Sequence, residues 1–449
     1  MKRFLLLTTA LLLACVTLVS AQSRGSYFFE NSLLRSKLNP AFAPQSTYLS
    51  VPVAGSLSLD AASNFGLGNF VFPRGDKNCL FLHPDVPATD FLSKLPAKDP
   101  YLKERLETDL LGAGMPVGSY GYATVSLSFV ENGSALLPGD LLRFAKVSDT
   151  GIFNGRYDDF RIHLMGYTSL AAGYSHDMEF LLPGLRLGGR VKLLVGLAAA
   201  NVSIQQIDLQ FGPEMVAART LGGGSLSGIT YDPVEGFQLM GLGLRGIGAA
   251  VDLGASWRLS LDGFVDGVEV SASACDLGGI HYNRSLTRVD LDGSLSFSGI
   301  SDFSGDLQEQ LNELFTELGS LTHFQTSEGK GFGCWLSPSF HAGAAATFWQ
   351  HRLNAGLLYY HTVGHDNLMA SVGASPLEWL NLGVNWTFLG PAQRFGFFAE
   401  YIPRRYVGLF VGMERASWRT NNRLLPIGNA TTSLSLGLNI LFGDYSFWQ

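Results

Sequence analysis

The sequence has 449 residues, with 31 Lys and Arg against 38 Asp and Glu, so its formal charge is −7. Charged residues make up only 15% of the chain, whereas a soluble domain usually carries about 25%. Because 46% of the residues are hydrophobic, the composition excludes a disordered chain and disfavours an ordinary cytosolic enzyme. The acidic balance also argues against a nucleic-acid partner, since such proteins cluster Lys and Arg against phosphates.

The amino terminus has the organisation of an export signal. Two basic residues precede an apolar run over residues 4–19, and the small residues that follow suit cleavage before Gln22. We therefore predict a signal peptide over residues 1–21. The alternative, a lipoprotein site at Cys15, is disfavoured because the apolar run continues past this cysteine.

After this leader, the sequence has no apolar run of the roughly 18 residues that a transmembrane helix needs. The best candidate, residues 191–204, is interrupted by Lys192, Asn201 and Ser203. Only helices and closed barrels satisfy every backbone polar group in lipid. The hydrophobic bias therefore points to a β-barrel.

The first half of the exported chain mixes turn, strand and helix signals. Asn39-Pro40-Ala41 predicts a turn, because proline after asparagine favours turn initiation. Residues 50–59 and 124–129 alternate apolar with small polar residues, as strands do. Residues 88–112 are interpreted as two short helices, since leucines recur at a spacing of four in their second half.

Residues 304–321 do not follow the period-two alternation of the second half of the sequence. Leucines at helical spacing, with acidic residues elsewhere on the wheel, predict an amphipathic helix inside a long connection. Two roles stay open for it. It covers a barrel mouth, or it docks an exported partner protein through its apolar face, which consists of Leu307, Leu311, Leu314 and Leu318.

The carboxyl-terminal part makes the strongest case for a barrel. Residues 380–388, 407–413 and 433–442 each repeat with a period of two, with Leu, Val, Trp and Phe mainly on one face. The other face carries mostly Gly, Ser, Thr and Asn, whereas a secreted β-sandwich would place Lys, Glu and Asp there. We count about fourteen such segments and predict an all-β, antiparallel transmembrane barrel over residues 47–449.

Three motifs resemble known nucleotide, nucleophile or metal sites, but the residues around them argue against each site. Residues 241–246 match the dinucleotide pattern G-x-G-x-x-G, but they lie within an expected strand over residues 242–259, with no following helix to bind phosphate. Residues 224–228 resemble a nucleophile elbow but place Leu226 where serine is required. His361 and His365 flank Gly364, which indicates a turn and no shared metal site. We expect no enzyme activity, no metal and no cofactor.

Three cysteines remain after the predicted leader, Cys79, Cys275 and Cys334. Their spacing matches no metal framework of paired cysteines, and an odd number leaves at least one thiol free. We expect unpaired thiols.

The turn at Asn39-Pro40-Ala41, shortly after an exported amino terminus and before Gly-rich strands, resembles the FadL and PorV type of outer-membrane barrel. Asp109–Gly114, Gly189–Gly196 and Ser375–Gly383 are closer still to a domain-of-unknown-function family of Gram-negative outer-membrane proteins. The resemblance implies a barrel of about fourteen strands in the outer membrane. It also implies a plug over residues 22–46 that contains Asn39, Pro40 and Ala41.

Two functions stay open at this point. In the first, the barrel gives small hydrophobic molecules passage or a binding site, and the plug gates their release. In the second, the barrel is a non-transporting scaffold that docks another exported protein through the 304–321 helix. Membrane lipid surrounds the protein in both, and neither involves nucleic acid.

Overall fold

The computed structural model describes residues 24–442, apart from the short gaps given at the end of this paragraph. The predicted signal peptide and the predicted 304–321 helix, with Leu307, Leu311, Leu314 and Leu318, therefore lie outside the described residues. The gaps are 45, 53, 75–76, 82, 84, 141, 144–152, 158–159, 212–215, 233–235, 242, 291–292, 298–324, 363, 391, 404–405 and 416–431.

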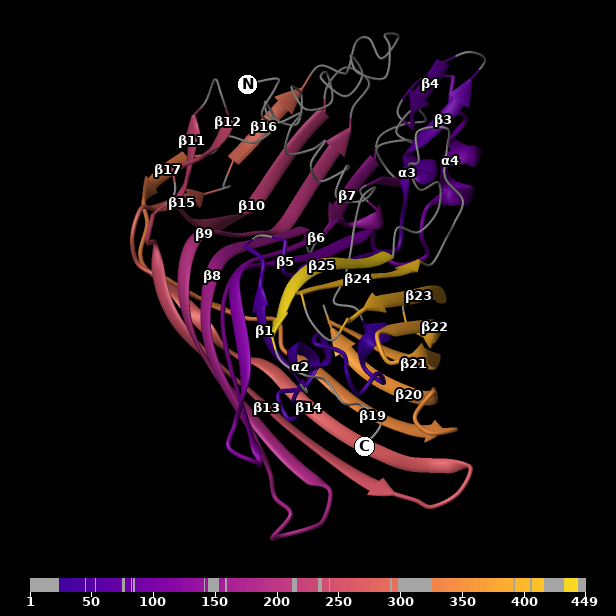
Figure 1. Ribbon diagram of the computed structural model, residues 1–449. Coiled ribbons are helices and arrows are strands. Elements are labelled where there is room, and N and C mark those ends of the chain that lie inside the picture. Colours follow the sequence, from indigo (N-terminus) through magenta and orange to yellow (C-terminus); the bar gives the residue numbers. More distant parts are fainter. Residues whose placement is uncertain are drawn as a thin grey trace.

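One antiparallel sheet closes on itself (Figure 1). The last strand, β25 (Thr432–Phe442), pairs with β1 (Thr47–Ser50) and β2 (Leu57–Ser63). Both of these pair in turn with β5 (Tyr101–Val117). The result is the closed 14-strand barrel that the sequence predicts. Closure leaves no sheet edge at membrane depth, where unpaired backbone groups would be costly.

One side of the barrel consists of long strands. Some of its wall positions are built from collinear pieces: β10 and β13, for example, both pair with β9, one beyond the other. Short additional strands pair at its upper end. The strands of this side are β6 (Gly121–Leu136), β7 (Phe153–Tyr157), β8 (Phe160–Asp177), β9 (Leu185–Phe211), β10 (Val216–Ser227), β11 (Ile229–Asp232), β12 (Gly236–Leu239), β13 (Gly246–Ser260), β14 (Val265–Tyr282), β15 (Leu286–Asp290), β16 (Gly293–Phe297), β17 (Gln325–Glu328), β18 (Phe332–Trp335) and β19 (Ser339–Phe348).

The other side consists of short strands joined by hairpins. Strand β9 has 27 residues, whereas β20 has 10 and β23 has 8. Figure 1 shows that the long-stranded side reaches beyond these strands at both ends. The short strands are β20 (Leu353–Thr362), β21 (His365–Leu377), β22 (Leu380–Leu389), β23 (Arg394–Tyr401) and β24 (Tyr406–Arg415), followed by β25.

The two faces of the wall differ as the alternation predicts. On β22, Val384 is 61% exposed on the outer face, while Asn381 and Thr387 on the inner face are fully buried. Exposed apolar side chains of this kind recur around the barrel, which suits a surface in contact with lipid. Among the described helices, none is long and apolar enough to span a membrane.

The predicted pair of short helices over residues 88–112 is wrong in its second half. Helix α4 (Ala88–Lys94) lies there, but residues from Tyr101 onward form β5. Leucines spaced four residues apart lie on one face of a strand as well as on one face of a helix, because four is a multiple of the two-residue period of a strand. A register shift between Asp109 and Leu111 also hides the alternation.

The predicted strand over residues 50–59 is interrupted. Strand β1 ends at Ser50 and β2 begins at Leu57, and the residues between them form a turn in which the Ala54 N–H donates to the Val51 carbonyl. Both strands still pair with β5 and β25, so they share one position in the wall.

A small module connects β2 to β5 at the end of the barrel where the connections are long. It contains α3 (Leu67–Phe70), β3 (Val71–Arg74), β4 (Lys77–Leu80) and α4. Its own apolar core includes Phe72, Phe81 and Phe91, whose burial explains why this connection is ordered.

Candidate functional site

Residues 24–44, which we call the inner segment, lie inside the barrel (Figure 1). The segment begins with η1 (Arg24–Ser26) and includes one turn of helix, α2 (Arg35–Leu38). All of its residues are buried except Glu30, Lys37 and Ala43, which are half-buried. The lumen is therefore occupied by the chain itself over part of its height.

Three consecutive aromatic residues of the inner segment pack on glycines of the wall. A Cβ atom on Gly343 would come within 2.5 Å of the Tyr27 ring, and one on Gly356 within 2.6 Å of the Phe28 ring. Phe29 lies equally close to Gly373 on β21. The glycines on the inner faces of these strands thus make room for aromatic rings.

Asn39-Pro40-Ala41 lies against β13 and β14. The Asn39 amide donates hydrogen bonds to the Ala255 and Ala272 carbonyls, both at 3.2 Å, and its side-chain oxygen accepts one from the Ala41 N–H at 2.9 Å. The turn fits over two paired wall glycines that leave space for it, Gly188 and Gly254. This contact fixes the position of the inner segment against the wall. The role of Asn39-Pro40-Ala41 as a gate stays a prediction.

Ion pairs attach the inner segment at several heights. Arg24 is fully buried and donates to both carboxylate oxygens of Asp60 on β2, at 2.7 and 3.2 Å. Arg35 pairs with Glu269 on β14. Because each partner neutralises a buried charge, these pairs specify one docked position for the segment.

A further anchor pairs Glu30 of the inner segment with an arginine and a histidine of the barrel. Glu30 lies 2.6 Å from an Arg258 nitrogen and 3.6 Å from Nδ1 of His351, which is in the turn between β19 and β20. The hydrogen bond with Glu30 raises the pKa of His351 despite partial burial. Burial opposes ionisation of Glu30, but the contacts with His351 and Arg258 still hold the pKa of this carboxyl below its ordinary value.

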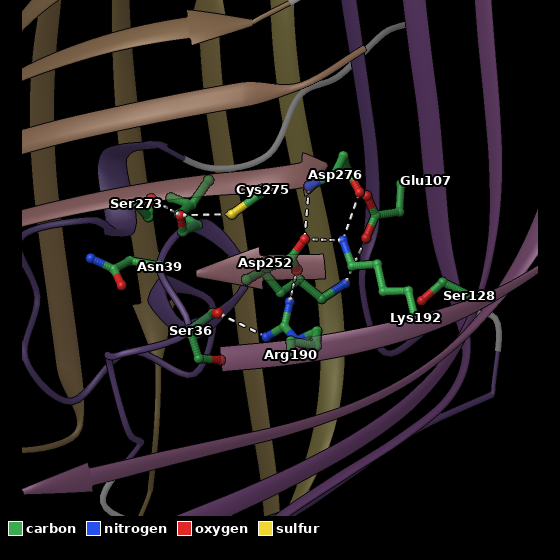
Figure 2. A network of polar contacts seen from close by, with 12 residues as sticks. Ser36, Asn39, Glu107, Ser128, Arg190, Lys192, Asp252, Ser273, Cys275 and Asp276 are labelled. Atoms are coloured by element: carbon green, nitrogen blue, oxygen red, sulfur yellow. Dashed lines mark hydrogen bonds and ion pairs between the residues drawn. The ribbon is translucent and has the colours of Figure 1, made fainter. Parts of the chain in front are cut away.

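Charged side chains from the long-stranded side converge on the lumen (Figure 2). Lys192 on β9 lies 2.8 Å from Asp252 on β13 and 2.6 Å from Asp276 on β14. Arg190 pairs with Asp252 at 3.3 Å, and the Asp252 side chain is fully buried. Such groups are costly to bury unless every charge is paired.

The cluster extends across the lumen to β5. Arg105 lies 2.9 Å from Asp276 and 3.0 Å from Glu107, and Lys37 of the inner segment lies 2.7 Å from Asp109 and 3.5 Å from Glu107. We call this set the ionic layer. Its four cations balance its four anions, and its members are Lys37, Arg105, Glu107, Asp109, Arg190, Lys192, Asp252 and Asp276.

A local backbone irregularity shapes the centre of the ionic layer. The β13–β14 register shifts at Asp252, and Asp276 adopts a left-handed φ of 61°. Aspartate tolerates this conformation better than most residues. The Asp276 N–H then donates to Asp252 at 2.8 Å, so the bulge brings the two carboxylates to the same cations.

Two cavities lie at and above the ionic layer. The larger, of about 160 Å³, is lined by residues such as Asn132, Ser134 and His163. The smaller, of about 40 Å³, lies within the layer and is lined by every ionic-layer member except Asp252 and by small polar side chains such as Thr124 and Ser126. An apolar cluster, of which Val130 and Tyr167 also line the smaller cavity, comprises Val130, Met165, Tyr167, Leu194, Ala199, Ala250, Ile280, Tyr282, Cys334 and Leu336.

The chemical motifs that were excluded on sequence grounds lie next to strands and turns in the structure. Residues 241 and 243–245 precede β13, and no helix follows them. His361 and His365 lie on either side of a turn at Gly364, whose φ is 69°. Cys79, Cys275 and Cys334 are free and buried. Among the described residues, no group of His, Cys, Asp and Glu is placed to hold a metal.

The family model for a family of unknown function, DUF5723, matches residues 40–412. The chain belongs to this family. The match includes all three sequence pieces that carry the predicted resemblance, and that prediction is confirmed. No curated protein matches the sequence.

Solved structures similar to this chain are barrels with remote sequences. They include a TodX deltaS2S3 mutant monoaromatic hydrocarbon channel, with 10% identity, 92% of this chain and 95% of that chain covered, and a TM-score of 0.39. A Pseudomonas aeruginosa FadL homologue has 12% identity, 96% and 99% coverage, and a TM-score of 0.37. The Ralstonia pickettii toluene transporter TbuX has 10% identity, 92% and 94% coverage, and a TM-score of 0.33.

The ionic layer is absent from the predictions made from the sequence, although the sequence carries a signal for it. The chain is poor in charge, yet Arg190, Lys192 and Asp252 occur at even spacing on the faces of apolar, alternating strands. A charged residue inside a membrane strand is expensive unless it faces the lumen and has a partner. Charges at such positions therefore predict lumen contacts.

Proposed function

We propose that this protein is an outer-membrane β-barrel that gives small hydrophobic molecules passage or a binding site, with the inner segment closing the lumen. The observation that carries the proposal is the buried inner segment within a wall whose outer face is apolar. A stopper of this kind is needed only where the barrel would otherwise be open. Asn39, Pro40 and Ala41 hold the stopper against β13 and β14.

The orientation follows from the lengths of the connections. Short turns such as 118–120 and 349–352 lie at the end of the barrel where β1 begins. Long connections such as 64–100 lie at the other end. Outer-membrane barrels have short periplasmic turns and longer extracellular loops. The inner segment therefore fills the periplasmic part of the lumen in this proposal.

The apolar cluster around Met165 supports a hydrophobic ligand. Its side chains face the lumen, and Tyr282 is fully buried there with no hydrogen-bond partner for its hydroxyl among the described residues. The side chains of the cluster are at most 5% exposed, so a ligand would enter between them, and an apolar molecule there would leave water at a gain in free energy. The larger cavity is lined by polar residues, so we place the binding site in the cluster.

Binding of the hydrophobic fluorophore 1-N-phenylnaphthylamine to the purified barrel in nanodiscs tests this proposal. We expect saturable binding after the signal of empty nanodiscs is subtracted. Met165→Asn should weaken it at least tenfold, because it places an amide in the apolar cluster. Met369→Asn is the matched control, since Met369 is as deeply buried but packs in another cluster with Tyr27 and Phe28. Absence of saturable binding would contradict the proposal.

The second hypothesis of the sequence analysis, a scaffold that docks an exported protein, rests on Leu307, Leu311, Leu314 and Leu318. These lie outside the described residues. The hypothesis therefore stays a prediction, as does the expected lack of enzyme activity.

A further inference from the structure

We infer that the ionic layer is a second closure of the lumen, distinct from the inner segment, and that Lys37 is the residue through which the segment keeps this closure shut. The inference rests on the proposed function, since a closure matters only for a passage. It concerns small hydrated ions, which differ in chemistry from the hydrophobic ligand proposed above.

The ionic layer spans the lumen from wall to wall. Arg105 lies on β5 and Asp276 on β14, and β6, β8, β9 and β13 lie between these strands in the wall. A 2.9 Å contact between their side chains therefore crosses the interior and does not follow the wall. It separates the space enclosed by the long strands from the rest of the lumen.

The inner segment fills mainly the other space. Its aromatic residues Phe28 and Phe29 pack on β20 to β22, and Tyr27 packs on β19, the last strand of the long-stranded side. On the side of the ionic layer, two consecutive residues of the segment make polar contacts. The Ser36 carbonyl accepts a hydrogen bond from Arg190 at 2.9 Å, and the Lys37 ammonium pairs with Asp109 and Glu107.

The space enclosed by the long strands is polar at the ionic layer and above it. Within the layer, the small cavity is lined by Thr124, Ser126 and Ser128 and by every ionic-layer member except Asp252. Above it, the larger cavity is lined by Asn132 and Ser134 of the same strand, and the Asn132 amide nitrogen is buried without a hydrogen-bond partner among the described residues. A hydrophilic path along β6 thus leads into the ionic layer, where the ion pairs close it.

Lys37 completes the charge balance of the ionic layer. Without it, three cations would face four anions, and Asp109 would lose its ammonium partner. An uncompensated buried carboxylate draws in water and a counter-ion, because burial without a partner is costly. Surplus carboxylates in a pore also favour cations. Withdrawal of the segment would therefore open this path as well.

Planar-bilayer recordings in potassium chloride test the inference, with no hydrophobic probe present. We expect Lys37→Gln to produce cation-selective current steps at least ten times more often than wild type. The double variant Lys37→Gln with Asp109→Asn restores neutrality and should return to the wild-type level. Asp109→Asn alone leaves a surplus cation and should give an anion-selective leak. Lys94→Gln, in the module outside the barrel, is the matched control.

Three results would overturn the inference. The first is a closed Lys37→Gln variant that still shows the heat-modifiable gel migration of a folded barrel. The second is a double variant that leaks as much as Lys37→Gln, which would mean that contact and not charge closes the path. The third is an equal leak in Arg35→Gln, which loosens the segment without touching the ionic layer. Fluorophore binding is measured separately, so failure of the proposed hydrophobic ligand is distinguishable from each of these.

Discussion

The two sides of the barrel differ in the side chains that fill the lumen next to them. The short strands β20 to β25 face a lumen filled by aromatic residues of the inner segment, which fit against wall glycines. The long strands β5 to β14 face each other across a set of ion pairs. The first filling is apolar and comes from the inner segment, whereas the second is charged and comes from the wall, with Lys37 as the one contribution of the inner segment to the ionic layer.

This difference determines how each side responds to change. Apolar packing loses stability in proportion to the atoms removed, and neighbours relax into the space. A buried ion network responds more steeply, because removal of one member leaves its partners charged and unpaired. The comparison predicts that substitutions in the ionic layer have the larger effects.

The largest expected effect is that of Asp252→Ala. Lys192 and Arg190 would lose their shared carboxylate, and the expected loss in the free energy of unfolding is about 3–5 kcal/mol. Thr387→Val on the short-stranded side is the comparison, since Thr387 is also fully buried but its hydroxyl has, among the described residues, a neutral 3.4 Å contact with the Tyr360 hydroxyl. Its expected loss is about 1 kcal/mol. Urea unfolding in lipid vesicles, followed by tryptophan fluorescence, measures both. Equal losses would remove the distinction between the two sides.

Phe28→Ala tests the apolar filling. Phe28 is 4% exposed and packs with Tyr27 and Leu358, so the substitution should cost about 3 kcal/mol through lost burial and a cavity. The same unfolding experiment measures it. In contrast to Lys37→Gln, this variant should remain closed to ions in bilayer recordings, and a leak as large as that of Lys37→Gln would contradict the comparison.

Gly254→Val tests the fit of the Asn39-Pro40-Ala41 turn. A Cβ atom at Gly254 would come within 2.0 Å of the Asn39 side-chain oxygen, so the inner segment must shift at an expected cost of about 1–3 kcal/mol. Trypsin cleavage in the segment, at Arg35 or Lys37, should become faster. Gly189→Val is the control, because its nearest neighbour would be 3.8 Å away. Unchanged cleavage in Gly254→Val would show that the turn is not held by this contact.

The smallest expected effect is a pH dependence at Glu30 and His351. The pKa of His351 is raised, so its contribution is present below the ordinary value of 6.5 and is lost as the pH rises through the folded value. The pKa of Glu30 is lowered, so its contribution is present above 4.5 and is lost in acid. Trypsin protection of the segment should therefore peak between about pH 4.5 and 6.5. His351→Phe should flatten the upper limb, and an unchanged upper limb would exclude His351. Arg258 lies 3.1 Å from Nδ1 of the same imidazole, and Asp266 accepts a hydrogen bond from the His351 backbone N–H at 2.8 Å.

The barrel could be predicted from the sequence because its short strands obey one rule. On β22 and β25, apolar residues face lipid and small polar residues face the lumen at most steps, and the buried Leu441 on the inner face of β25 is an exception. The rule fails where a bulge changes the face, as at Leu110 in β5. Leu102, Leu106 and Leu110 then fit a helix as well as a strand, and only the pairing with β2 and β6 decides.

The site was harder to predict than the wall. Asn39-Pro40-Ala41 is visible as a turn, but its neighbours Gly188 and Gly254 are more than a hundred residues away in the chain. The ionic layer likewise joins residues of β5 to residues of β14, whose proximity depends on how the sheet curves. Local patterns fix which face a charge occupies, while the partner across the lumen follows only from closure of the sheet.

Strand β9 changes the face of its side chains at a register shift. Leu187, Val191 and Leu193 are exposed apolar residues of the outer face, whereas beyond the shift the polar Asn201 pairs with His163, which lines the larger cavity. The long-stranded side reaches beyond the short strands and forms a one-sided collar (Figure 1). A molecule arriving from outside meets this screen from one direction and a low rim from the other, so the approach to the lumen is directional.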